Sequence, residues 1–185
     1  METNIASKLA AMANQKPPNK ILAISTDSKS AVQVSEGILN YFVNDLKLKG
    51  IYIAFTTPTK QMFAKMKNGK QILDNIKVID AIGTKKTAIS GENAQCMQGP
   101  TALTEISICI TKCTNTGKCG FVYVDSMTSL TRYNGSELAE RFMRYLINKL
   151  RSMDIPRQIL FVYDEKTNPM VNIALPLVDE HIIMK

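Results

Sequence analysis

Residues 121–126 read Phe121-Val122-Tyr123-Val124-Asp125-Ser126, an apolar run that ends in an acid and a hydroxyl. Apolar side chains at successive positions indicate a strand covered on both faces, because a strand with one wet face would alternate apolar and polar residues. Downstream, residues 136–153 carry the strongly amphipathic pattern of a long helix. The stretch therefore predicts a buried strand that delivers the Asp125 carboxylate to one edge of a sheet.

Similar runs recur on both sides of this stretch. Predicted strands cover residues 21–25, 51–56, 78–81, 121–125 and 158–163, and predicted helices cover 32–46, 59–67, 101–112 and 136–153. This alternation is typical of a three-layer, doubly wound α/β fold, in which helices cover both faces of a mostly parallel sheet. The end of the chain departs from it. Two extended runs, 170–175 and 178–184, are joined by Pro176 and predict a C-terminal antiparallel hairpin at one edge of the sheet.

The length of the chain bounds its domain organisation. With 185 residues, 45% of them hydrophobic, it can bury one substantial core, and two full domains would be cramped. Residues 3–14 predict a short helix, which the Pro17-Pro18 pair ends. We therefore expect an N-terminal helical appendage with a Pro-Pro linker over residues 1–19 and a single α/β domain over residues 20–185. Residues 83–99 have no periodicity and predict a long surface loop.

The composition favours a cytoplasmic protein without a membrane partner. No run approaches the roughly 18 consecutive apolar residues of a membrane helix, and the apolar stretch 9–13 is too short for a secretion signal. The cysteines should then be thiols. The spacing of Cys109, Cys113 and Cys119 does not match a zinc ribbon, so we favour buried thiols over a metal site. We expect the single histidine, His181, to be structural.

The charge of the chain is basic. Its formal net charge is +7, and residues 46–73 contain six lysines and no acid. A solvated lysine-rich face is the preferred interpretation, because no arginine-rich or aromatic recognition pattern accompanies these lysines. Nonspecific nucleic-acid binding stays open as a third class of function, through Lys60, Lys65, Lys67 and Lys70.

Several stretches carry a family resemblance when they are taken together. They are Gly50-Ile51-Tyr52-Ile53-Ala54-Phe55, residues 99–108, residues 123–130 with Tyr133-Asn134, Glu140-Arg141-Phe142, and residues 177–183. In this order and spacing they resemble the KaiC-like branch of the RecA superfamily, most closely its small archaeal members. The resemblance covers about residues 20–185. It implies a RecA-like P-loop NTPase fold, in which Asp125 and Ser126 correspond to the Walker B motif.

The resemblance also implies an ATP site, but the Walker A loop is degenerate. A P-loop, G-x-x-x-x-G-K-[ST], wraps bare backbone amides around phosphate, while its lysine and hydroxyl reach phosphate and magnesium. Here the loop after the first strand reads Ser25-Thr26-Asp27-Ser28-Lys29-Ser30, without a glycine. Lys29 and Ser30 are a partial remnant. Asp27 adds a charge that repels phosphate unless that charge is paired.

A second element of hydrolysis is also missing. Hydrolysing members of the superfamily place a water-orienting acid after the second strand, where this chain has Thr56-Thr57-Pro58. We therefore predict no catalytic residue. The candidates for nucleotide contact are Lys29, Ser30, Asp125 and Ser126, with Asp125 as the magnesium ligand. An equally weighted interpretation makes Asp125 a structural hydrogen-bond partner of a neighbouring loop.

These observations lead to two main hypotheses. The first is a pseudo-ATPase: a KaiC-like domain that has lost its phosphate-binding loop and acts as a non-hydrolysing regulatory or protein-interaction module. RecA-type domains commonly assemble side by side, so this hypothesis implies a protein partner or a homo-oligomer. The alternative is an ATP-binding protein or weak ATPase that holds ATP and magnesium in an atypical site. The first hypothesis requires no cofactor.

Overall fold

The computed structural model describes residues 20–82, 94–115, 119–152, 158–164 and 175–184, with the single positions 7, 92 and 117. The described strands are β1 (Ile21–Thr26), β2 (Gly50–Ala54), β3 (Ile76–Asp80), β4 (Ala94–Cys96), β5 (Phe121–Asp125), β6 (Gln158–Asp164) and β7 (Glu180–Ile183). The helices are α2 (Ala31–Asn40), continued by the π-helical turn η1 (Tyr41–Asp45), then α3 (Thr59–Lys65), α4 (Gly69–Leu73), α5 (Leu103–Thr114), α6 (Met127–Asn134) and α7 (Ser136–Arg151). A 3-10 turn, η2 (Leu175–Leu177), precedes β7.

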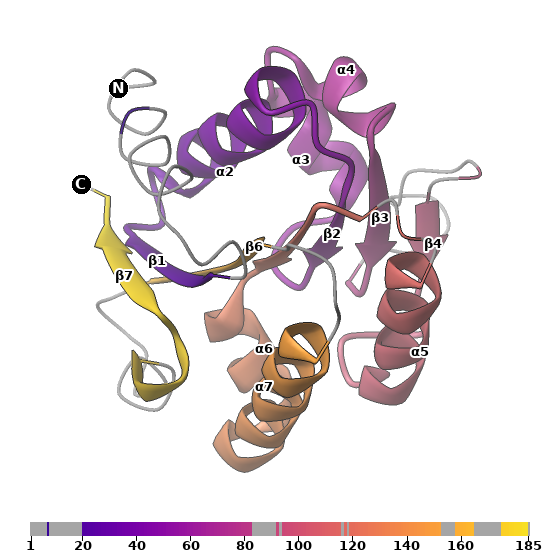
Figure 1. Ribbon diagram of the computed structural model, residues 1–185, viewed down its shortest axis with the longest axis vertical. Coiled ribbons are helices and arrows are strands. Elements are labelled where there is room, and N and C mark those ends of the chain that lie inside the picture. Colours follow the sequence, from indigo (N-terminus) through magenta and orange to yellow (C-terminus); the bar gives the residue numbers. More distant parts are fainter. Residues whose placement is uncertain are drawn as a thin grey trace.

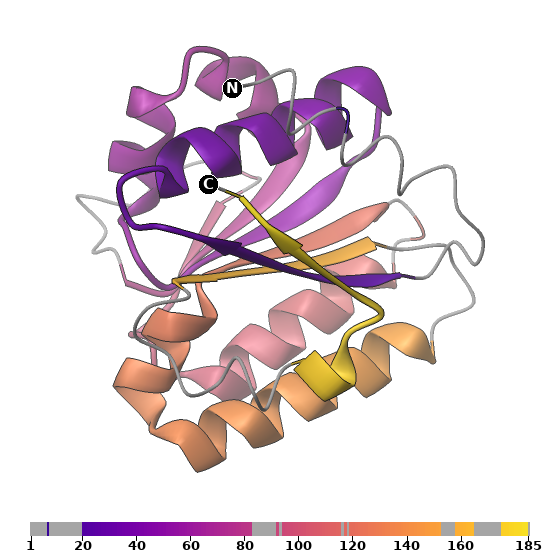
Figure 2. The same ribbon diagram turned by 90° about the vertical axis from the view of Figure 1, so that its left-hand side faces the viewer.

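The strands form one sheet in the order β4-β3-β2-β5-β6-β1-β7. All described pairs of neighbouring strands are parallel. Helices α2, α3 and α4 cover one face of the sheet, and α5, α6 and α7 cover the other (Figures 1 and 2). This is the predicted three-layer, doubly wound α/β architecture.

A separate hydrophobic core fills each side of the sheet. On β2, Ile51 and Ile53 belong to the core beneath α5, α6 and α7, whereas Tyr52 and Ala54 belong to the core beneath α2, α3 and α4. All four side chains are at most 1% exposed. Both faces of the strand are therefore dry, which explains why the strands are apolar at successive positions.

The second strand of the predicted C-terminal hairpin is present at one edge of the sheet as β7. β7 pairs with β1 in parallel, with Leu22 opposite Glu180 and Ser25 opposite Ile183. Residues 170–174, the other half of the prediction, lie outside the described residues. An apolar run looks the same with a parallel or an antiparallel partner, because orientation depends on where the connection brings the chain back. Here it returns to the start of β1, where the Asp179 amide donates to the Ile21 carbonyl at 2.8 Å.

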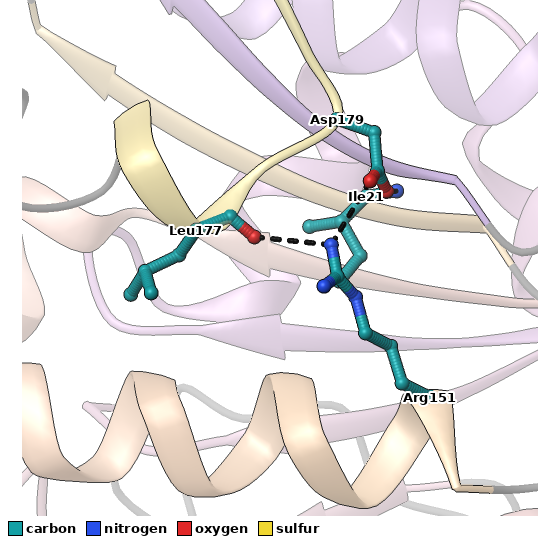
Figure 3. A network of polar contacts seen from close by, with 4 residues as sticks. All are labelled: Ile21, Arg151, Leu177 and Asp179. Atoms are coloured by element: carbon teal, nitrogen blue, oxygen red, sulfur yellow. Dashed lines mark hydrogen bonds and ion pairs between the residues drawn. The ribbon is translucent and has the colours of Figure 1, made fainter.

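A small polar network fixes the start of β7 (Figure 3). The Asp179 carboxylate accepts a 2.7 Å hydrogen bond from the Ile21 amide and a 3.0 Å hydrogen bond from the Arg151 guanidinium. Arg151 also donates to the Leu177 carbonyl at 3.3 Å. The network therefore joins the beginnings of β1 and β7 to the last turn of α7.

Three described elements differ from the sequence prediction. β4 lies inside residues 83–99, predicted as a loop, and extends the sheet beyond β3. Helices α4 and α6 were not predicted, because five and eight residues are too few for a clear helical period. The predicted appendage, residues 1–19, lies outside the described residues apart from Ser7.

The described cysteines lie in or beside the core. Cys109 and Cys119 are buried, and Cys113 is partly buried. Within the described part of the chain, no three His, Cys, Asp or Glu side chains lie together as a metal site would require. His181 lies on β7 with Nε2 at 2.7 Å from the buried Ser25 hydroxyl. None of the described helices combines the length and apolar character that a membrane crossing needs.

Candidate functional site

The candidate site lies at the carboxyl edge of the sheet, where β1, β2 and β5 end. Strands β2 and β5 are neighbours, with Ala54 opposite Asp125. The loops that follow all three strands line one pocket of about 260 Å³. Its lining consists mainly of hydroxyl side chains, with two carboxylates and one guanidinium: Thr26, Asp27, Ser28, Ala31, Val32, Thr56, Thr57, Asp125, Ser126, Thr128, Ser129 and Arg132.

Asp125 lies at the bottom of this edge with only 7% of its surface exposed. The Tyr52 hydroxyl donates a 2.6 Å hydrogen bond to Oδ2, and the Thr56 hydroxyl donates a 3.3 Å hydrogen bond to Oδ1. The peptide bond between Asp125 and Ser126 is cis. Both carboxylate oxygens therefore have protein donors, as the structural interpretation of Asp125 requires.

Burial dominates the electrostatics of this carboxylate. Desolvation raises the pKa of Asp125 above the usual value for aspartate, and the hydrogen bonds from Tyr52 and Thr56 offset part of that rise. Desolvation, followed by the nearby Asp125 charge, also raises the pKa of the Tyr52 hydroxyl well above its usual value. Tyr52 therefore keeps its proton and remains a hydrogen-bond donor to Asp125.

Thr56 connects the polar groups around Asp125. Its hydroxyl lies 3.1 Å from the Ser126 hydroxyl and 3.1 Å from the Ser129 hydroxyl. Ser126 in turn caps α6 by accepting a 3.3 Å hydrogen bond from the Ser129 amide. Thr56 follows β2, where the resemblance places the water-orienting acid of hydrolysing relatives. A network of hydroxyl groups lies at that point in this chain.

In the loop after β1, the Asp27 carboxylate accepts hydrogen bonds from the two residues that precede α2. Oδ1 of Asp27 accepts 2.8 Å hydrogen bonds from the backbone amides of Lys29 and Ser30. Oδ2 of Asp27 accepts a 3.1 Å hydrogen bond from the Ser30 hydroxyl. Helix α2 begins at the next residue, Ala31. The carboxylate therefore binds donors at a helix N-terminus, where a phosphate-binding loop would present them to phosphate.

The four predicted contact residues fall into two groups. Asp125 and Ser126 line the pocket. Lys29 and Ser30 lie in the loop after β1 but are not among the residues that line it. Lys29 is exposed, and Ser30 is turned toward the Asp27 carboxylate.

Sequence reasoning missed three features of this edge. Tyr52 gave no signal, because a tyrosine within an apolar strand counts as one more apolar residue. Arg132 lines the pocket from α6, a helix that was not predicted. The pairing of Asp27 had a readable signal, since an aspartate in a turn commonly accepts hydrogen bonds from backbone amides shortly after it in the sequence.

Comparison with known proteins supports the fold and goes no further. No family model matches the sequence, and no curated protein matches it either. Among solved structures, the chain is similar to a KaiC-like protein from the hyperthermophilic archaeon Pyrococcus horikoshii, with a TM-score of 0.59. The match covers 90% of this chain and 70% of that one at 11% sequence identity. The chain has the fold of this KaiC-like protein. At this identity the likeness carries over no activity, substrate or partner.

Proposed function

We propose that this KaiC-like domain is a pseudo-ATPase, a non-hydrolysing module for regulation or protein interaction. The observation that carries the proposal is the Asp27 carboxylate, which holds the Lys29 and Ser30 amides at 2.8 Å each. A nucleotide phosphate would have to displace a carboxylate that is already hydrogen-bonded to these donors. The phosphate would then lie beside the displaced Asp27 carboxylate, and the two negative charges would repel each other.

The surroundings of Asp125 support the same proposal. A magnesium ligand must be open to the ion, whereas Asp125 is only 7% exposed and protein hydroxyls donate to both of its oxygens. The hydroxyls of Thr56, Ser126 and Ser129 are poor bases at neutral pH. They give an attacking water no acceptor for its proton.

The size of the pocket weighs against the alternative of an atypical ATP site. Pockets that enclose a small-molecule ligand usually measure about 300–1,000 Å³. The pocket at this edge measures about 260 Å³, and Lys29 does not line it. The observation that favours the alternative is Arg132, which gives the pocket one cation that could meet a phosphate group.

Isothermal titration of the protein with ATP, with and without magnesium, tests the proposal. We expect no heat of binding up to millimolar ATP. The variant Asp27→Gly frees the two amides, and we expect it to gain weak affinity for ATP and inorganic phosphate. Magnesium-dependent binding to the wild type that is lost in both Asp125→Asn and Lys29→Ala would overturn the proposal in favour of the atypical ATP site.

The nature of the partner is part of the proposal. We propose a protein partner or a homo-oligomer, in keeping with a domain that is retained without nucleotide chemistry. Nucleic-acid binding is the weaker candidate. It rests on Lys60, Lys65, Lys67 and Lys70, all of which are exposed around α3 and α4. Salt-sensitive retardation of DNA or RNA would support it, and its absence at low salt would remove it.

A further inference from the structure

An apolar groove runs between α5 and α7, on the sheet face opposite α2. Figures 1 and 2 show both helices on this side of the sheet. The groove has a volume of about 530 Å³, twice that of the pocket at the carboxyl edge. Its lining residues are Leu103, Thr104, Ser107, Ile108, Thr111, Lys112, Leu138, Arg141, Phe142 and Tyr145.

Large apolar side chains form the walls of this groove and are open to solvent. Ile108 on α5 is 49% exposed, and Leu138 and Tyr145 on α7 are each 47% exposed. Leu138, Phe142 and Tyr145 follow one another at helical spacing, so they form one stripe along α7. Within this stripe Phe142 is buried, whereas Leu138 and Tyr145 are half exposed. Contiguous apolar surface of this kind marks binding sites more often than single exposed residues do.

We propose that this groove docks an amphipathic helix from an acidic segment of a partner protein. The inference rests on the proposed function, because it locates the surface through which the module would act. The apolar side of the helix would enter between Ile108 and Tyr145. Its acidic side chains would meet Lys112 and Arg141.

The charge of the groove selects an acidic partner. Among the described residues that line it, the two charged ones are both cations, Lys112 and Arg141, and none is an acid. Arg141 pairs with Glu137 one turn earlier on α7, but both side chains are at least 70% exposed. An exposed pair of this kind is worth little and exchanges readily for a better-placed carboxylate. The whole chain carries a formal net charge of +7, which attracts the same kind of segment at longer range.

A second copy of this chain fits the groove less well. In a two-fold dimer the same patch meets itself, so one concave groove would face another and neither would be filled. The two copies would also bring +7 against +7. A single helix is convex and fits between two helices. Over Leu103 to Lys112 the groove extends about 14 Å, the length of two to three turns of a bound helix.

Fluorescence anisotropy with a designed peptide tests this inference. The probe is a labelled amphipathic peptide of about 16 residues, with leucines at helical i, i+4, i+7 and i+11 spacing and glutamates on the flanks. We expect saturable binding to the wild type. Because Leu138 and Tyr145 are half exposed, Leu138→Ser and Tyr145→Ser should keep the fold and weaken binding by roughly tenfold or more. The matched control is Ile183→Ser, which removes a 41% exposed apolar side chain from β7 and should leave binding unchanged.

A charge exchange tests the acidic preference. A second peptide, with lysines in place of the glutamates, should bind the wild type more weakly. The double variant K112E/R141E should reverse that order. Three results would overturn the inference: no saturable binding by the wild type, equal binding of both peptides to it, or a concentration-dependent dimer that Leu138→Ser and Tyr145→Ser dissociate. The last result would identify a second copy as the occupant.

The same protein samples separate this inference from the proposed function. Each is titrated with magnesium and ATP before the peptide is added. Hydrolysis of ATP would remove the proposed function and leave a positive peptide result standing as a property of the groove. If the protein binds neither ATP nor the peptide, the groove inference is wrong, and the pseudo-ATPase proposal still stands.

Discussion

The Tyr52 hydroxyl lies 2.6 Å from Oδ2 of Asp125 and donates a hydrogen bond to it in the interior of the protein. The neighbouring Tyr123, with its ring centroid 5.5 Å from that of Tyr52, contacts the Ser35 hydroxyl at 2.7 Å instead. Both tyrosines are fully buried. Tyr52 is therefore hydrogen-bonded to an ionisable group and Tyr123 to a neutral hydroxyl, within the same core.

This difference between the tyrosines can be measured as stability. Tyr52→Phe should lower the free energy of unfolding by about 1.5–3 kcal/mol, the usual range for a bond to a charged group. Tyr123→Phe is the matched control and should cost about 0.5–1.5 kcal/mol, because its bond joins two neutral hydroxyls. Urea unfolding of both variants at neutral pH provides the comparison. Equal losses would mean that Asp125 is neutral there or gains nothing from Tyr52.

The raised pKa of Asp125 predicts a pH dependence of stability. The folded protein keeps the Asp125 proton to a higher pH than the unfolded chain does. The contribution of this group to the free energy of unfolding is therefore largest at low pH. It declines as pH rises from the usual pKa of aspartate through the raised one.

Asp125→Asn should remove that decline, so the variant should gain stability relative to the wild type as pH rises through this window. Urea midpoints of both proteins from about pH 3 to pH 8 would show the change, since the window begins near the usual aspartate pKa. Parallel curves for the two proteins would contradict the prediction.

The Asp27 carboxylate should stabilise the start of α2. Asp27→Ala removes the acceptor of the Lys29 and Ser30 amides and should cost about 0.5–1.5 kcal/mol, the usual net contribution of a hydrogen bond. Asp74→Ala is the control, because Asp74 is an exposed acid at the other end of a helix, α4, and should change stability by less than about 0.5 kcal/mol. Thermal unfolding of the two variants gives the difference. If Asp27→Ala left the stability unchanged, the hydrogen bonds of the Asp27 carboxylate would not contribute to the stability of this loop.

The Asp179 network predicts unequal effects of its two charged members (Figure 3). Asp179→Ala leaves the amide of the fully buried Ile21 without this acceptor and should cost about 1–3 kcal/mol. Arg151→Ala removes an ion pair whose side chains are 44% and 40% exposed, and should cost at most about 1 kcal/mol. Denaturant unfolding measures both. A larger loss for Arg151→Ala would place the stabilisation in the ion pair.

The predictable part of this fold lies where periodicity and burial coincide. The run that ends at Asp125 is apolar at every step because both faces of β5 are covered, so strand, sheet type and the place of the carboxylate all follow from sequence. β7 shows the limit of that reasoning. Its pattern identifies a strand, but its direction depends on a connection whose path no local pattern encodes.

The candidate site was only half predictable for a related reason. Asp125 and Ser126 follow a recognisable strand and do line the pocket. Tyr52 reaches Asp125 from a different strand, across 73 positions of sequence, and such a pairing exists only after the sheet has formed. The sequence shows that the loop around Asp27 has none of the glycines of a phosphate-binding loop. The structure adds that the Asp27 carboxylate accepts hydrogen bonds from two backbone amides of this loop.

The position of β1 in the sheet has a consequence for how the protein is made. Both neighbours of β1, the strands β6 and β7, begin at Gln158 or later, so a ribosome releases β1 long before either partner exists. Until then, the backbone groups along both edges of the segment Ile21–Thr26 lack their strand partners. Unpaired strand edges of this kind promote aggregation. A chain that ends before residue 158 should therefore need a chaperone to stay unaggregated, even though it contains the strands β1 to β5.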